Sequence, residues 1–237
     1  MRFSQVGLNL LTAVEATCSS LRPFLDINFL TQVLIAFAVL LFSLTFHELA
    51  HAWTADRLGD PTARLLGRVS FNPIVHADPI GTVLFPLLAL IGNLPIIGWA
   101  KPVPVAISRL RRQRRDYVLV AAAGPASNLI LAVLASLTLA VIPIDPVVLD
   151  APNVAAPIVT FLSMAISLNI LLAVFNMLPI PPLDGGNVLS GLLPLRFAAM
   201  LDQVRPYGFL ILYALLFTNG FYYFVVQPSN FLRSWLP

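Results

Sequence analysis

Long uncharged runs alternate with short charged segments along this 237-residue chain. A run of about 20 mostly apolar residues is long enough to cross a bilayer as a helix. Apolar runs that meet this length, uncharged apart from Glu48, lie at 27–55, 117–143, 153–178 and 206–227, and a further apolar segment lies at 80–99. The pattern predicts an all-α polytopic membrane protein, with a bundle of roughly four to six transmembrane helices.

The 80–99 segment differs from the other apolar runs because prolines and glycines interrupt it. Pro86, Gly92, Pro95 and Gly98 would break or kink a straight helix. The segment therefore either spans the bilayer with kinks or enters and returns on the same side.

Basic residues predict the orientation of the spans. Residues 100–116 carry one lysine and five arginines, whereas 144–152 carries two aspartates and no basic residue. By the positive-inside rule the first of these segments is cytoplasmic and the second lies outside. The loop at 57–78 is also basic, so both flanks of 80–99 are expected in the cytoplasm, which favours a re-entrant segment.

Composition supports one membrane-embedded domain over residues 1–237, with a core at about 27–190 and C-terminal membrane helices at about 206–235. The chain is 58% hydrophobic and only 11% charged, and its mean hydropathy is +0.87. Soluble proteins carry about 25% charged residues. The net charge of +3 is clustered, so we expect it to set orientation and contact lipid headgroups rather than bind nucleic acid. The single cysteine, Cys18, excludes an intrachain disulfide framework.

Two short segments beside the apolar runs have strand-like composition. Arg64–Ser70 and Pro102–Ile107 include β-branched residues, which predicts a small membrane-associated β element.

The chemistry-bearing motif is His47-Glu48-Leu49-Ala50-His51, which closes an uncharged run that begins after Asp26. Residues at positions i and i+4 share a helix face, so both imidazoles can reach one metal ion. This HExxH pattern is typical of a zinc site with a glutamate general base. Ionisable groups in a membrane segment are costly and usually functional.

Two further segments are predicted at the same depth as this motif. Catalytic zinc commonly has three protein ligands, and Asp184, just after the 153–178 span, is the candidate third ligand. Asn128 follows Gly124-Pro125-Ala126-Ser127 near the start of the 117–143 span, and its amide would lie near the metal site. The small residues there allow close helix approach.

With these motifs the chain resembles the site-2 protease family of intramembrane zinc metallopeptidases, and specifically the compact branch that lacks a PDZ domain. The resemblance covers about residues 40–190. The family's aspartate motif is often written Asn-Pro-x-Asp-Gly, and here the spacing between Asn176 and Asp184 is longer. The matching segments are His47 to His51, Phe71-Asn72-Pro73, His76-Ala77-Asp78-Pro79, Gly81, Pro86, Gly124 to Asn128, and Asn176 to Gly185.

The resemblance implies a mechanism and a residue for each step. His47, His51 and Asp184 would bind Zn²⁺, and Glu48 would deprotonate the zinc-bound water and pass the proton to the leaving amine. Asn128 would support the substrate or the oxyanion, and Asn176 the unwound substrate. The substrate would be a transmembrane protein, cleaved in regulated intramembrane proteolysis. We expect a multi-pass protein of a prokaryotic inner membrane, with its active site toward the cytoplasm.

Other interpretations of these residues stay open. The histidines and Glu48 could form a polar patch between helices, Asp184 could cap a helix, and Asn128 could make an interhelical hydrogen bond. A membrane di-iron oxygenase needs many more than three histidines. The alternative function is a metal-binding transporter or a catalytically inactive membrane scaffold, neither of which requires Glu48 as a base.

Overall fold

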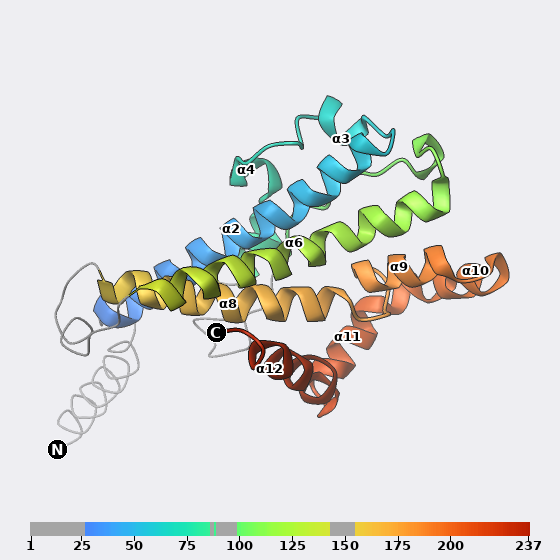
Figure 1. Ribbon diagram of the computed structural model, residues 1–237. Helices are drawn as coiled ribbons and strands as arrows, with labels where there is room; N and C mark the ends of the chain where they lie inside the picture. Colours follow the sequence, from blue (N-terminus) through green and yellow to red (C-terminus); the bar gives the residue numbers. More distant parts are fainter. Residues whose placement is uncertain (1–26, 86–87, 89–98, 143–154) are drawn as a thin grey trace, which may run out of the picture. The chain divides into compact units, whose positions relative to one another are not determined.

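The structure is a computed structural model that describes residues 27–85, 88, 99–142 and 155–237 (Figure 1). The chain divides into two compact units, residues 1–38 and 39–237. Of the first unit, residues 27–38 are described, and they form the start of helix α2. Apart from this first part of α2, the residues discussed below belong to the second unit.

Within the described part of the chain, three helices are long and apolar enough to cross a membrane: α2 (Ile27–Arg57), α6 (Gln113–Val141) and α8 (Ala155–Asn176). Helix α2 has no glycine or proline in its 31 residues, and it ends at a turn where Gly59 has a φ of +112°. Only glycine adopts this backbone conformation readily, which explains the abrupt stop. These helices confirm the predicted runs at 27–55, 117–143 and 153–178 as helical.

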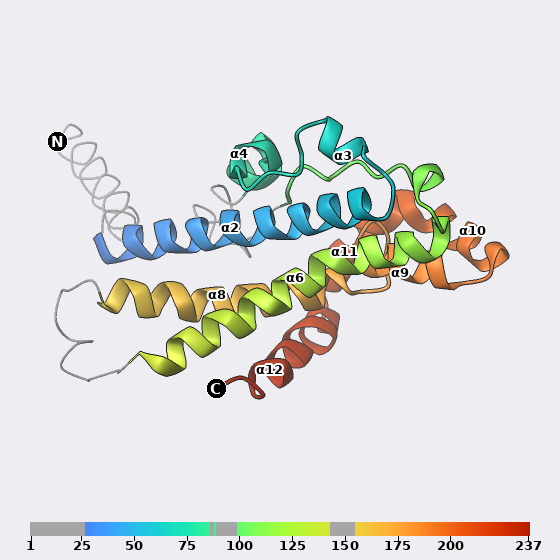
Figure 2. The ribbon, with the colours of Figure 1, turned by 45° about the horizontal axis from the view of Figure 1, so that its top comes forward.

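Helices α6 and α8 run antiparallel and side by side in both views (Figure 1, Figure 2). Helix α6 makes extensive contacts with α8 and with α9 (Asp184–Leu192), which follows α8 after a short turn. Helix α9 leads into α10 (Leu195–Val204), and α12 (Gln227–Arg233) packs against α8.

The predicted span at 206–227 is wrong as a single helix. The chain forms α11 (Gly208–Leu216), then a turn, then a π-helical segment (Tyr222–Val226) that continues into α12. At the break, the Thr218 hydroxyl donates to the carbonyl of Leu215 and accepts the N–H of Gly220. A side chain that competes for backbone hydrogen bonds in this way ends a helix.

Short helical turns connect α2 to α6. They begin where an Asn or Asp precedes a proline: the Asn72 side chain accepts the N–H of Ile74 at the start of α4 (Pro73–His76), and Asp78 caps the π-helical segment Pro79–Leu84. Such caps satisfy the free N–H groups of a first turn. The other turns of this connection are α3 (Thr62–Leu65) and the 3₁₀ turn Ile107–Arg109, and a further 3₁₀ turn, Arg205–Tyr207, joins α10 to α11. Most of the predicted re-entrant segment at 80–99 lies outside the described residues.

The predicted β element is also wrong, because the described residues contain no strand. Residues 62–65 are helical, and 101–106 form an extended segment without a neighbouring strand. Its Lys101 N–H donates to the carbonyl of His76, and side chains bind several of its other backbone groups. The buried Arg68 donates to the carbonyls of Val75, Lys101 and Pro102. At the far end of this extended segment, the N–H of Ala106 donates to Asp60 at 2.6 Å.

Candidate metal centre and active site

Two helices bring three potential metal ligands together. His47 and His51 lie one turn apart on α2, and Asp184 is the first residue of α9. The two Nε2 atoms are 3.1 Å apart, and Asp184 Oδ2 lies 3.1 Å from that of His47 and 3.3 Å from that of His51. Both histidines are buried and Asp184 is nearly so. The three ligand atoms therefore surround a single point.

The outer nitrogen of each imidazole has its own partner. His51 Nδ1 lies 2.7 Å from the carbonyl of Val120, and His47 Nδ1 lies 2.6 Å from Asn128 Oδ1, both on α6. A carbonyl only accepts, so Nδ1 of His51 carries a proton, and Nε2 is the nitrogen left to bind a metal ion. Partners of this kind orient metal-binding histidines.

The geometry of the three ligand atoms fits a zinc ion. Asp184 Oδ2 is buried without a hydrogen bond and lies within 3.3 Å of both Nε2 atoms, as expected for ligand atoms that face one ion. Ligands at about 2.0–2.1 Å in tetrahedral geometry lie roughly 3.3 Å from one another, close to the separations seen here. Two imidazoles and a carboxylate are also a common donor set for catalytic zinc.

Gly124 explains how α6 comes so close to the histidines. A Cβ atom at this position would lie 2.4 Å from His51 Nε2 and 2.6 Å from His47 Nε2. A side chain here would occupy the space that the three ligand atoms face. The close approach of α6 to the histidines therefore requires a residue without a side chain at position 124, in the small-residue segment predicted near the site.

Asp184 is placed by the packing of α9. A Cβ at Gly185 would lie 2.3 Å from the carbonyl oxygen of Met177, so the first turn of α9 fits against the end of α8 only with glycine there. The Asp184 carboxylate is in the first turn of α9, where the helix dipole favours a negative charge.

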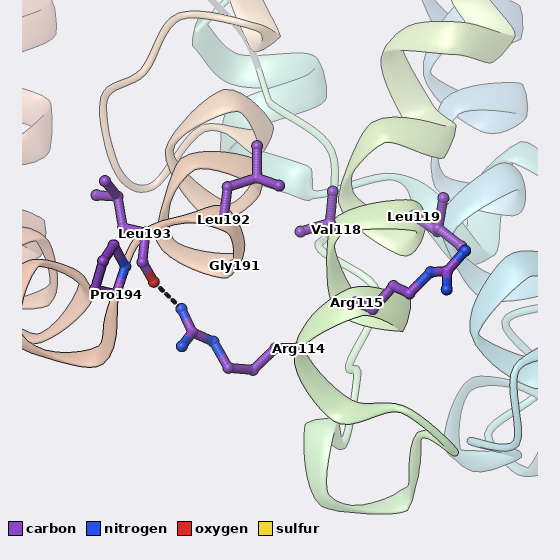
Figure 3. A pocket seen from close by; sticks show the side chains of 8 residues that line it. All are labelled: Arg114, Arg115, Val118, Leu119, Gly191, Leu192, Leu193 and Pro194. Atoms are coloured by element: carbon purple, nitrogen blue, oxygen red, sulfur yellow. Dashed lines mark hydrogen bonds between the residues drawn. The ribbon is translucent and has the colours of Figure 1, made fainter.

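The far end of α9 is held by a basic residue of α6. Arg114 donates to the carbonyls of Ser190 and Leu193, which are free at a helix C-terminus (Figure 3). Beside this contact is a groove of about 510 Å³ between the start of α6 and the end of α9, which Arg115 also lines. The groove contains none of the three ligand residues, so it is not the candidate centre.

Comparison with known proteins identifies the family. The family model for peptidase family M50 matches residues 35–148 and 142–218. The chain belongs to peptidase family M50.

Curated relatives of this M50 protein cover most of its length. It is 39% identical over 209 residues to "Putative zinc metalloprotease YwhC" of Bacillus subtilis (strain 168), covering 88% of this chain and 86% of the relative. It is 33% identical over 201 residues to "Putative zinc metalloprotease Rip2" of Mycolicibacterium smegmatis (strain ATCC 700084 / mc(2)155), covering 84% of this chain and 71% of the relative. No solved structure matches the chain. The resemblance to the site-2 protease family is confirmed, with zinc as its metal.

Glu48 of this M50 protein has a defined environment beside the centre. It is buried next to His47, and its Oε2 accepts the N–H of Val103 at 3.0 Å. Val103 lies in the extended segment 101–106, between the carbonyls that bind Arg68 and the N–H that binds Asp60. One carboxylate oxygen of Glu48 is thereby fixed.

The remaining candidates are not at the ligand atoms. Asn176 donates to the carbonyl of Leu172 on its own helix. His76 is buried, with Nε2 2.9 Å from the carbonyl of Ser70 and Nδ1 without a partner. Among the described residues, the group that could hold a metal comprises His47, His51 and Asp184.

Several residues around the centre had no signal in the sequence. Asn169 and Arg68 are single polar residues in apolar or loop segments, and Val103 contributes only its backbone. For Asn169 the one indication was its position inside an apolar run, because a polar residue in a membrane helix usually has a partner, but the sequence did not identify that partner.

Proposed function

We propose that this protein is an intramembrane zinc metalloprotease that hydrolyses peptide bonds of transmembrane-helix substrates. His47, His51 and Asp184 hold the zinc ion, and Glu48 is the general base. The observation that carries the proposal is the convergence of three ligand atoms within 4.8 Å of one another, with the buried Glu48 carboxylate beside them on a membrane-length helix.

The protein's own residues perform the proton transfers of the proposed reaction. Zinc bound at this site would supply a Lewis acid that polarises the scissile carbonyl and lowers the pKa of the attacking water toward about 7. Glu48 takes a proton from the water and gives it to the leaving amine. The N–H of Val103 holds Oε2 of Glu48, so the other oxygen is left to carry the proton.

The substrate must lose its helical structure before attack, because helical backbone groups are bonded to one another. Asn176 is the last residue of α8, and α9 begins at Asp184 after a short turn. Its Nδ2 is already bonded within α8, so the amide oxygen is the group that would contact an unwound segment.

The proposed setting is a multi-pass protein of a prokaryotic inner membrane with the centre toward the cytoplasm. The motif lies near the end of α2, and the basic first turn of α6 is close to that end. The N–H of Arg111, just before α6, donates to the carbonyl of Leu58, just after α2. The positive-inside rule places such an end on the cytoplasmic side. Arg115 is exposed there and would contact anionic lipid headgroups.

The test compares zinc content and cleavage in the same detergent-purified samples. Zinc is measured for wild type, His47→Ala, Asp184→Ala and Glu48→Gln, and cleavage is followed with a panel of synthetic single-span membrane peptides. We expect about one zinc per chain in wild type, strong loss in both ligand variants, and full zinc but no cleavage in Glu48→Gln.

The outcomes separate the proposal from its alternatives. Zinc binding with no effect of Glu48→Gln on cleavage would exclude Glu48 as the base. Zinc bound without cleavage of any peptide, together with zinc uptake into vesicles, would favour a transporter. If the wild-type protein binds no zinc even after zinc is supplied, the result would favour an inactive scaffold.

A further inference from the structure

A line of buried amides connects α8 to the metal centre. Asn169 Nδ2 donates to the carbonyl of Ala165 at 2.8 Å, and Asn128 Nδ2 donates to Asn169 Oδ1 at 2.8 Å. Asn128 Oδ1 lies 2.6 Å from His47 Nδ1. Both asparagines are almost completely buried, at 0% and 1% exposure. The line thus joins three membrane-length helices through groups that water does not reach.

The direction of these hydrogen bonds is set at the end farthest from the centre. The Ala165 carbonyl can only accept, so the amide nitrogen of Asn169 must face it and its oxygen must face Asn128. Asn128 then donates to that oxygen and presents its own oxygen to His47. The proton of His47 is therefore on Nδ1, and its Nε2 lone pair faces His51 and Asp184.

We propose that Asn169 is a positioning residue for zinc binding, acting through Asn128 to set the tautomer and ring orientation of His47. The proposal rests on the zinc site proposed above and extends it to a residue on α8 that touches none of the ligand atoms. It also gives Asn128 a role other than the substrate or oxyanion support expected from the sequence, because both ends of its amide are engaged and none of its surface is exposed.

The physical basis is the low dielectric of the site. Loss of Asn169 leaves a buried donor of Asn128 unpaired, and a buried polar group without a partner is strongly disfavoured. Asn128 can recover a partner only by rotating or flipping its amide, which would turn a donor toward His47 Nδ1. The tautomer of His47 with its proton on Nε2 would then be favoured, and in that tautomer Nε2 has no lone pair for the metal. Ordinary interhelical hydrogen bonding predicts lower stability alone, whereas this arrangement also predicts weaker metal binding.

The experiment measures zinc affinity by chelator competition and the visible spectrum of the cobalt-substituted protein. Asn169→Ala should weaken zinc binding by about tenfold or more and shift the cobalt bands. Asn169→Asp keeps an oxygen facing Asn128, so its zinc affinity should be closer to that of wild type than the affinity of Asn169→Ala is. The matched control is Ser136→Ala, which removes another fully buried polar group, one that donates to the carbonyl of Pro237, and should leave zinc affinity and the spectrum unchanged.

The possible results have distinct meanings. If wild type binds zinc but Asn169→Ala keeps wild-type affinity and spectrum, the positioning role is overturned while the zinc site stands. If wild type binds no zinc, the proposed function itself fails. Should Asn169→Ala not fold, Asn169→Ser replaces it, because a serine hydroxyl can bond back to the helix as Ser167 does but is too short to reach Asn128 as the amide does. The same loss of affinity is then expected, and wild-type affinity would refute the role.

Discussion

The backbone N–H of Val103 donates to Glu48 Oε2 at 3.0 Å, across 55 positions of sequence. The contact fixes the carboxylate of the proposed base. The segment that makes it, Pro102 to Ala106, contains no ionisable residue. Its geometry depends on the anchors of that segment, chiefly the Arg68 guanidinium on the carbonyls of Lys101 and Pro102. Arg68 should therefore influence catalysis without approaching the metal ligands.

Replacing Arg68 with methionine should reduce cleavage by about tenfold to a hundredfold while one zinc per chain is retained. The methionine fills the buried space but leaves three carbonyls unpaired, so the extended segment shifts and Val103 no longer holds Glu48. The measurement is kcat on a cleaved membrane peptide beside zinc content. The control is Arg64→Met, because the Arg64–Asp56 pair is largely exposed and such pairs contribute little. Equal activity of both variants would contradict the role of Arg68.

Gly124→Ala should abolish stoichiometric zinc binding. The added methyl group would lie 2.4–2.6 Å from the Nε2 atoms of both histidines, and these rings are held by Asn128 and Val120, so they cannot move aside without losing those bonds. Metal analysis of the purified variant checks this. Ala126→Val adds volume two residues away at an exposed position of the same helix and should keep its zinc. A zinc-replete Gly124→Ala protein would show that the rings have room to move.

Stability should depend on pH through Asp60, which is buried beyond the end of α2. Burial raises the pKa of this carboxyl, but hydrogen bonds from Thr62 and from the Ala106 N–H, with the charge of Arg109, outweigh burial and hold the pKa below its ordinary value. The ionised form therefore stabilises the folded state above the unfolded pKa of about 3.9, and this contribution is lost as pH falls through the lower folded pKa.

The corresponding measurement is the apparent Tm of zinc-free wild type and Asp60→Asn between about pH 3 and 7. Using zinc-free samples removes the effect of metal release in acid. Wild type should exceed the variant near neutral pH, and the difference should shrink below about pH 4. A difference that is constant over this range would show that ionisation of Asp60 contributes nothing.

Arg114→Gln should lower both the stability and the zinc affinity of the protein. Arg114 holds the last carbonyls of α9 (Figure 3), and the first residue of α9 is Asp184. Hydrogen bonds from a charged group contribute about 1.5–3 kcal/mol, so we expect a lower apparent Tm and weaker zinc binding. Arg115→Gln is the matched control, since Arg115 lines the same groove and is exposed. Equal effects of the two substitutions would point to loss of positive charge in general.

The sequence alone determined the features that belong to short segments. Hydropathy over about 20 residues identified α2, α6 and α8, and the i, i+4 spacing placed His47 and His51 on one helix face. Asp184 was found by the need for a third zinc ligand and by its predicted depth. The helices and the shared face could be predicted because helix periodicity and hydropathy are properties of consecutive residues, whereas the ligand role of Asp184 stays a prediction although its carboxylate lies beside both histidines.

Tertiary structure decided what depends on partners far away in the chain. The extended segment at 101–106 forms no strand, because the Arg68 and Asp60 side chains take its backbone groups. The 206–227 run breaks where the Thr218 hydroxyl competes with the backbone. Asn169 is connected to His47 through Asn128 because α6 packs against α8 and its Asn128 also contacts His47 of α2. A hydrogen bond between distant residues is fixed by helix packing and leaves no periodic trace in the sequence, so only the folded protein reveals it.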